Sequence, residues 1–210
     1  MFFVAATEKL VERLRESRSR AVLLTSMPLT DCDVSVFCLP SLWLAARLSV
    51  KNYSSKQIND VSYVDYLRDL LKEYRIEPEY VQIEMTESLF LEKNNLSMRL
   101  FDRLQNMSIK LLLDDFGTGY SSLGYLTYVP IDEIKLDKSL VDAFLIEGKD
   151  SFIRDVILLV HDLNKTIVIE GVEQKWQYER LLEFEADSIQ GYYFSGPLEA
   201  DEAIDFEVKD

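Results

Sequence analysis

The chain has 210 residues, of which 48% are hydrophobic and 29% charged, and its formal net charge at pH 7 is −14. This length suits one globular domain with a large core and is short for two ordinary domains. The excess of acidic residues argues against a protein that follows a nucleic-acid backbone, but it is compatible with a small anionic ligand where bound divalent cations reverse the local charge.

Short apolar runs alternate with helical patterns from residue 48 onward. The expected strands cover residues 48–52, 80–84, 109–114, 131–136, 166–170 and 188–194, and the expected helices cover 63–74, 96–105, 151–163 and 174–184. Alternation of strands and helices within one domain predicts a parallel sheet that is either doubly wound or closed into a barrel. Before residue 48 the pattern indicates a helix over 7–16 and strands at 21–25 and 34–39.

The chain contains no apolar run long enough to cross a membrane and no secretory signal pattern, so we expect a cytoplasmic protein. Its two cysteines, Cys32 and Cys38, lie close together without a further Cys or His pair that would complete a zinc site. We therefore expect them to be reduced thiols.

Polar residues stand where the apolar runs stop. They are Asn52, Glu84, Asp114, Asp115, Lys135, Glu170 and Gln190. Any one of them could simply be solvated at a strand end. Together they favour a shared site, because the C-terminal ends of parallel strands converge on one face of a barrel.

Two adjacent carboxylates, Asp114 and Asp115, end the run from Lys110 to Leu113. Neighbouring carboxylates repel each other unless a cation or a proton lies between them, and a metal ion is the simplest explanation. Oxygen ligands without clustered His or Cys favour a hard ion such as Mg²⁺ or Mn²⁺ over zinc.

The segment 114–123, with the sequence DDFGTGYSSL, resembles the signature of EAL-domain cyclic di-GMP phosphodiesterases. Other family motifs follow in the family order: Asn52 with YSSKQ, EMTES at 84–88, IKLD at 134–137, EGVE at 170–173 and QGY at 190–192. The resemblance covers residues 48–198. It implies an α/β fold of the (β/α)8 TIM-barrel type and hydrolysis of cyclic di-GMP to linear pGpG.

The resemblance also assigns roles to individual residues. Asn52, Glu84 and Asp114 would hold one Mg²⁺ or Mn²⁺ ion, and Asp114, Asp115 and Glu170 would hold a second. Two such ions can activate water and stabilise both the attacking and the leaving oxygen of a phosphodiester. The resemblance gives Lys135, Glu170, Glu87 and Glu173 catalytic roles, with Glu87 tethering the glycine-containing loop, and it gives Gln190, Asn52 and Asp115 contacts with the ligand. A glutamate at 173 could instead complement the dipole of the helix that follows it.

The Glu-Ala-Leu motif that names the family is absent. Either Glu8-Lys9-Leu10 is a degenerate form of it, or the first strand is missing and residues 3–9 correspond to the segment after that strand. We favour the second interpretation, because Glu8 falls in the first turn of an expected helix. Residues 34–39 would then replace the first strand, or the barrel would be open with an exposed edge. We thus expect one EAL-type domain over 1–210, with 1–47 as an atypical segment.

Two other functions remain as alternatives. The chain could be a degenerate, catalytically weak or inactive EAL domain that acts as a cyclic di-GMP receptor or a protein-interaction module. A glycoside hydrolase on a similar barrel would use two carboxylates, and a lysine and an asparagine at strand ends fit that chemistry poorly. The resemblance further implies a homodimer through the loop 116–124 and the segment after Asp137, and a sensor or GGDEF domain fused in a longer parent protein.

Overall fold

The structure is a computed structural model that describes residues 36–38, 44–46, 48–50, 62–74, 77–87, 95–118 and 123–196. Eight strands form a single sheet in the order β2-β1-β8-β7-β6-β5-β4-β3. Their bounds are β1 (Val36–Cys38), β2 (Leu44–Ala46), β3 (Leu48–Val50), β4 (Val81–Thr86), β5 (Lys110–Phe116), β6 (Glu133–Leu136), β7 (Thr166–Ile169) and β8 (Ser188–Ile189).

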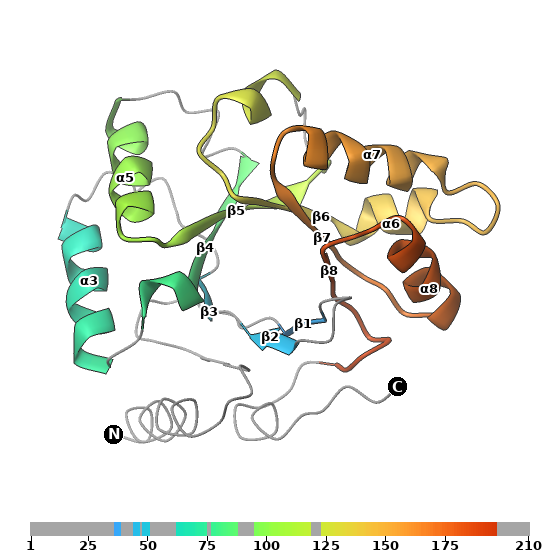
Figure 1. Ribbon diagram of the computed structural model, residues 1–210, viewed down its shortest axis with the longest axis horizontal. Coiled ribbons are helices and arrows are strands. Elements are labelled where there is room, and N and C mark those ends of the chain that lie inside the picture. The colour runs from blue at the N-terminus through green and yellow to red at the C-terminus, as the bar shows by residue number, and fades with distance from the viewer. Residues whose placement is uncertain are drawn as a thin grey trace.

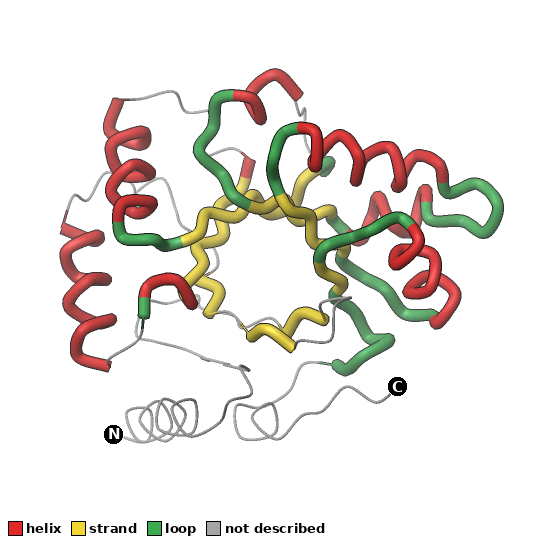
Figure 2. Tube along the Cα trace, viewed as in Figure 1, coloured by secondary structure: helices red, strands yellow, loops and turns green. Residues whose placement is uncertain are grey.

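The strands β3 to β8 pair in parallel, each with the next along the chain. The strands surround a central axis and the helices lie outside them (Figures 1 and 2). The helices are α3 (Ser62–Tyr74), α5 (Asn95–Asn106), α6 (Lys138–Phe144), α7 (Ser151–Asp162) and α8 (Lys175–Glu183), with the 3-10 helices η1 (Pro78–Tyr80) and η2 (Leu123–Thr127). This arrangement confirms the predicted barrel of alternating strands and helices.

The start of the barrel differs from an all-parallel one. β1 lies beside β8, so a strand within the predicted range 34–39 stands at the expected place. It pairs antiparallel to β8 through Cys38 and Ile189, and it is also antiparallel to β2. The five residues 39–43 between β1 and β2 suffice for a hairpin, whereas a parallel crossover needs about a dozen or more. Consequently the N-terminal end of β1 is directed toward the end of the barrel where the parallel strands finish. The expected helix at 7–16, the expected strand at 21–25 and Glu8 lie outside the described residues.

The main apolar core lies between the sheet and the helices. Ile153, Ile157 and Val160 of α7 are fully buried at helical spacing, and they belong to the same cluster as Ile167 and Ile169 of β7. Side chains alternate between the two faces of a strand, so the residues between these apolar ones face the barrel axis. The interior positions are mostly polar, and Leu112 and Val168 form a small separate apolar cluster there.

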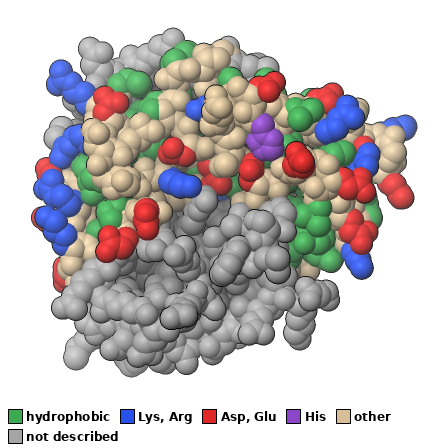
Figure 3. All heavy atoms as spheres, viewed as in Figure 1, with side chains coloured by type: hydrophobic (Ala, Val, Ile, Leu, Met, Phe, Trp, Pro, Cys, Tyr) green, Lys and Arg blue, Asp and Glu red, His purple; other side chains and the backbone are tan. Residues whose placement is uncertain are grey.

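The described surface carries charges of both signs. On the face drawn in Figure 3, Lys and Arg side chains gather toward the outer edges, over α3 and α5 and over α7, while acidic side chains occur both at these edges and nearer the barrel axis. Within the part of the chain that the structure describes, none of the helices has the length and hydrophobicity needed to span a bilayer. The cytoplasmic location stays a prediction.

A partly buried ion pair connects α7 and α8. Asp150 precedes α7 and is buried, and its carboxylate accepts hydrogen bonds from Arg180 Nε at 2.7 Å and Nη2 at 3.2 Å. The guanidinium also lies 4.6 Å from the ring centroid of Phe184. The hydrogen bonds from Arg180 lower the pKa of Asp150, although burial acts in the opposite direction.

We expect the Asp150→Asn variant to lose about 1–3 kcal/mol of unfolding free energy at pH 7, because a charge-assisted hydrogen-bond pair is lost. The Asp150 carboxylate contributes its full share of the unfolding free energy above its unfolded-state pKa of about 4. This contribution is lost as pH falls through the lowered pKa of the folded state. Urea unfolding at pH 7 and near pH 3 should therefore show that the stability difference between wild type and Asp150→Asn is smaller in acid. Asp162→Asn, at an exposed position, is the control. A difference that stays constant with pH would contradict this account.

Candidate functional site

The centre of the site is the buried ammonium of Lys135. Lys135 lies in β6, its relative exposure is 1%, and its Nζ is 2.7 Å from Glu170 Oε1 and 3.2 Å from Asp114 Oδ1. Glu84 Oε2 lies 3.8 Å from the same nitrogen. Four neighbouring strands, or the residue directly after one of them, thus contribute one charged side chain each to a single cluster at the C-terminal end of the sheet.

The strand registers explain this convergence. Asp114 of β5 lies opposite Thr86 of β4, two residues beyond Glu84, and Lys135 of β6 lies opposite Val168 of β7, two residues before Glu170. Because alternate residues of a strand share a face, these side chains all point toward the barrel axis. The sequence-based expectation that Glu84, Asp114, Lys135 and Glu170 lie together agrees with this geometry.

Asp115 is placed differently from its neighbour. Its backbone has φ +55°, in the left-handed region, and the pairing of β5 with β6 shifts register between Leu113 and Phe116. Its carbonyl oxygen accepts hydrogen bonds from Thr118 N at 3.2 Å and Thr118 Oγ1 at 3.0 Å. Asp114 is therefore buried in the cluster, whereas Asp115 is exposed at the turn above it.

The electrostatics of the cluster favour a positive charge. Burial alone would lower the pKa of Lys135, but the nearby Glu84, Asp114 and Glu170 carboxylates raise it well above its usual value. Lys135 is therefore an ammonium throughout the neutral range. One ammonium faces three carboxylates, so the cluster retains an excess of negative charge that attracts further cations.

The oxygens around Lys135 suit a hard divalent cation, because they belong to carboxylates. Gln190 Oε1 is buried and accepts no hydrogen bond from the described residues, so it has capacity for a donor or a cation. Within the described ranges no group of three acidic, His or Cys side chains is already arranged to hold a metal ion. The Lys135 ammonium, which lies within 4 Å of three of the carboxylates, occupies the middle of the cluster.

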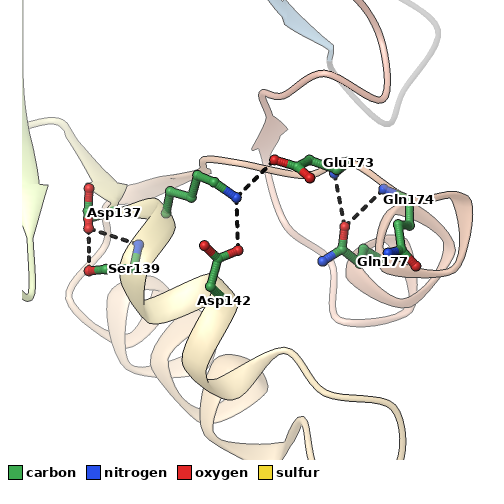
Figure 4. A network of polar contacts seen from close by, with 7 residues as sticks. Asp137, Ser139, Asp142, Glu173, Gln174 and Gln177 are labelled. Atoms are coloured by element: carbon green, nitrogen blue, oxygen red, sulfur yellow. Dashed lines mark hydrogen bonds and ion pairs between the residues drawn. The ribbon is translucent and has the colours of Figure 1, made fainter.

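Glu87, Gln190 and Glu173 lie in the segments that follow β4, β8 and β7. Glu87 follows β4 and is buried, and Gln190 follows β8, where its backbone N–H donates to Ile169 O at 2.8 Å. Glu173 lies at the surface beside α6, with its carboxylate 3.0 Å from Lys138 Nζ (Figure 4). Asn52 lies outside the described residues. The catalytic, ligand-binding and metal-binding roles assigned to these residues stay predictions.

The barrel interior holds a second polar group, around Glu133, that was not identified from the sequence. Glu133 at the start of β6 is buried and accepts hydrogen bonds from Gln82 Nε2 and from Thr166 Oγ1, the latter at 3.1 Å. Gln82 and Glu133 each stand two residues before a site residue, Glu84 and Lys135. The two-residue period of a strand could have identified them as interior positions.

We expect the Lys135→Met variant to be less stable by about 3–5 kcal/mol in the absence of metal, because the buried Glu84 and Asp114 and the partly buried Glu170 lose their cation. The ammonium contributes fully below its unfolded-state pKa of about 10.4, so pH 7 is a suitable condition. Millimolar Mn²⁺ should restore part of the loss in urea unfolding. Lys175→Met, which removes an exposed pair with Glu179, is the matched control. Equal stability of wild type and Lys135→Met would refute the role of the ammonium.

The chain is similar to known proteins over most of its length. The Pseudomonas aeruginosa protein named cyclic di-GMP phosphodiesterase NbdA is 35% identical over 164 residues, which are 76% of this chain and 21% of that protein. The solved structure described as the PaMucR phosphodiesterase in complex with c-di-GMP has a TM-score of 0.66 and 32% identity, covering 74% of this chain and 63% of that one.

A Klebsiella pneumoniae BlrP1 structure, described as a manganese and cyclic di-GMP complex, is 31% identical with a TM-score of 0.65 and covers 72% of this chain and 39% of that one. The chain spans about a fifth of the length of the curated relatives it matches. Residues 41–197, about three quarters of the chain, match the family described as EAL domain. This chain therefore belongs to the EAL domain family.

Proposed function

We propose that this chain hydrolyses cyclic di-GMP to linear pGpG with the help of divalent cations. The observation that carries the proposal is the Lys135 ammonium among Glu84, Asp114 and Glu170 at the C-terminal end of a barrel of this family. Relatives named as cyclic di-GMP phosphodiesterases and the structures of similar domains with this nucleotide support the substrate. Manganese in a similar structure supports a divalent cation, and Mg²⁺ is the other candidate.

The predicted site residues would have different roles in the hydrolysis. Glu84, Asp114, Asp115 and Glu170, with Asn52, would hold the cations. When bound, these cations would polarise a phosphoryl oxygen and make water nucleophilic at neutral pH. Lys135 is buried and charged, so its ammonium would stabilise negative charge that develops on the phosphoryl oxygens. Gln190, Glu87 and Glu173 would orient the nucleotide and the adjoining loops.

A nucleotide receptor with little turnover is the second candidate. The family's Glu-Ala-Leu motif is absent from the sequence, and β1, which stands beside β8, consists of Val36, Phe37 and Cys38, none of which is acidic. Loss of a carboxylate ligand would weaken the metal site more than it weakens nucleotide contacts made by Lys135 and Gln190. We propose that 1–47 is an atypical start of one domain whose recognisable barrel is 48–198, and that it works beside a sensor or GGDEF domain, as the greater length of its relatives suggests.

We expect hydrolysis to be weak and to require high metal concentrations. Changes to groups that merely support a ligand cost about 10- to 100-fold in metal affinity or activity, so the loss of a direct ligand should cost at least as much. The assay separates cyclic di-GMP from pGpG while Mg²⁺ or Mn²⁺ is titrated, alongside a nucleotide-binding isotherm. Asp114→Asn should abolish turnover.

Two results would change this conclusion. Binding without product at any metal concentration would identify a receptor. Robust turnover at roughly micromolar Mg²⁺ would show that another residue replaces the missing glutamate. Glu8→Gln would then be the variant to measure.

We also propose a homodimer that uses the segment after β6. Phe144 of α6 and Phe152 of α7 are in contact, with ring centroids 4.3 Å apart and ring planes tilted by 33°. Both rings are exposed, and so is Ile146 between the two helices. Neighbouring exposed apolar side chains are typical of contact surfaces. Sedimentation at roughly tens of micromolar protein should show a dimer that dissociates in Phe152→Glu. Tyr66→Glu, on α3, should leave it intact, and a wild-type monomer would disprove the proposal.

A further inference from the structure

Lys138, in the first turn of α6, bridges two segments that follow adjacent strands. Its ammonium lies 2.9 Å from Asp142 Oδ1 within α6 and 3.0 Å from Glu173 Oε1 in the segment after β7 (Figure 4). The turn itself is capped, because Asp137 Oδ1 accepts a hydrogen bond from Ser139 N at 2.9 Å. The backbone that carries Lys138 is therefore held in place directly after the strand that carries Lys135.

The methylenes of Lys138 lie on the turn between Glu170 and Glu173. Gly171 has φ +74°, and a Cβ added there would lie 2.3 Å from Lys138 Cγ and 2.8 Å from Lys138 Cβ. Both the left-handed backbone and the lack of space require glycine at this position. Lys138 thus contacts the turn that directly follows Glu170, whose carboxylate pairs with Lys135.

The backbone of the same turn is anchored from the other side. Val172 N donates to Gln190 O at 3.1 Å, and Glu173 N donates to Gln177 Oε1 at 2.9 Å. These bonds leave the Glu173 side chain to be oriented separately. Among the residues that the structure describes, Lys138 is the group that pairs with its carboxylate.

We propose that Lys138 is a positioning residue for the hydrolysis: its methylenes hold the Gly171 turn behind Glu170, and its ammonium fixes the orientation of Glu173. This inference rests on the proposed function of the site. The hydrogen bonds to Asp142 and Glu173 raise the pKa of Lys138, so the ammonium persists at neutral pH. Exposed ion pairs contribute little to stability, so the effect should appear in the geometry of the site.

The first test compares kinetic constants of Lys138→Met, which retains methylenes but lacks the charge, with those of Lys138→Arg and wild type in the full chain. With cyclic di-GMP and saturating Mn²⁺, we expect kcat to fall about tenfold in Lys138→Met, because small displacements of reacting groups are costly, with KM within about twofold. Lys138→Arg should recover most of the rate. Lys175→Met, which removes an exposed Lys–Glu pair on α8, should match wild type. A wild-type kcat in Lys138→Met would overturn the proposal.

A double-mutant cycle then tests whether Lys138 acts through Glu173. If it does, Lys138→Met should cause little further loss of kcat in a Glu173→Gln background, because the group that it orients is already altered. Full additivity of the two losses would show that Lys138 supports the fold in general and would overturn the positioning role.

Hydrogen exchange provides a measurement that does not need activity. In Lys138→Ala, which removes both methylenes and charge, the amides of residues 171–174 should exchange at least about tenfold faster while the core strands are unchanged. If wild type fails to hydrolyse cyclic di-GMP, the proposed function is wrong, and the exchange rates still decide whether Lys138 holds the turn. Unchanged exchange in Lys138→Ala would overturn that part of the proposal.

Discussion

The site depends on one interaction, the pairing of the buried Lys135 ammonium with carboxylates from the neighbouring strands. An isolated charge in the barrel interior would be strongly unfavourable, and the same holds for the Glu84 and Asp114 carboxylates, which are almost as deeply buried. Each group is tolerated because the others are there. The cluster therefore fixes which residues of β4 to β7 face the axis, and its surplus of acidic groups leaves it selective for cations.

The barrel interior can be polar because the main apolar core lies between the sheet and the helices. The residues that alternate with the site, such as Ile83, Ile134 and Ile169, belong to the large buried cluster formed with the helices. They supply the hydrophobic stabilisation, and the interior is free to hold charge. The polar interior continues below the site with Gln82, Glu133 and Thr166. There the buried Glu133 carboxylate is stabilised by hydrogen bonds from Gln82 and Thr166 and not by an ammonium.

The sequence predicted those features that depend on local pattern. Strands and helices from residue 48 onward followed the hydrophobic periods, except that the last strand was predicted over 188–194 and ends at Ile189, with a bend and a turn over 191–194. Glu84, Asp114, Lys135 and Glu170 were identified because each ends an apolar run. The separation of Asp114 from Asp115 was beyond sequence reasoning, because it depends on a left-handed residue at a register shift between β5 and β6. The antiparallel direction of β1 was equally hidden, since a three-residue strand has the same pattern in both directions. Helix α6 was not predicted, because it has only 7 residues and a single residue separates it from β6.

Close contacts at three glycines pack the loops at the end of the barrel against α6 and against one another. A Cβ at Gly117 would lie 2.1 Å from Leu140 Cδ1, one at Gly171 would meet Lys138, and one at Gly191 would lie 2.0 Å from the Val172 carbonyl oxygen. Three segments that carry site residues are thus packed against α6 or against one another. All seven glycines occur at residue 117 or later, so this half of the chain has the turns that permit such contacts. The positions of Asp114, Glu170 and Gln190 are consequently coupled through the packing of these loops, and those of Asp114 and Glu170 also through their ion pairs with Lys135.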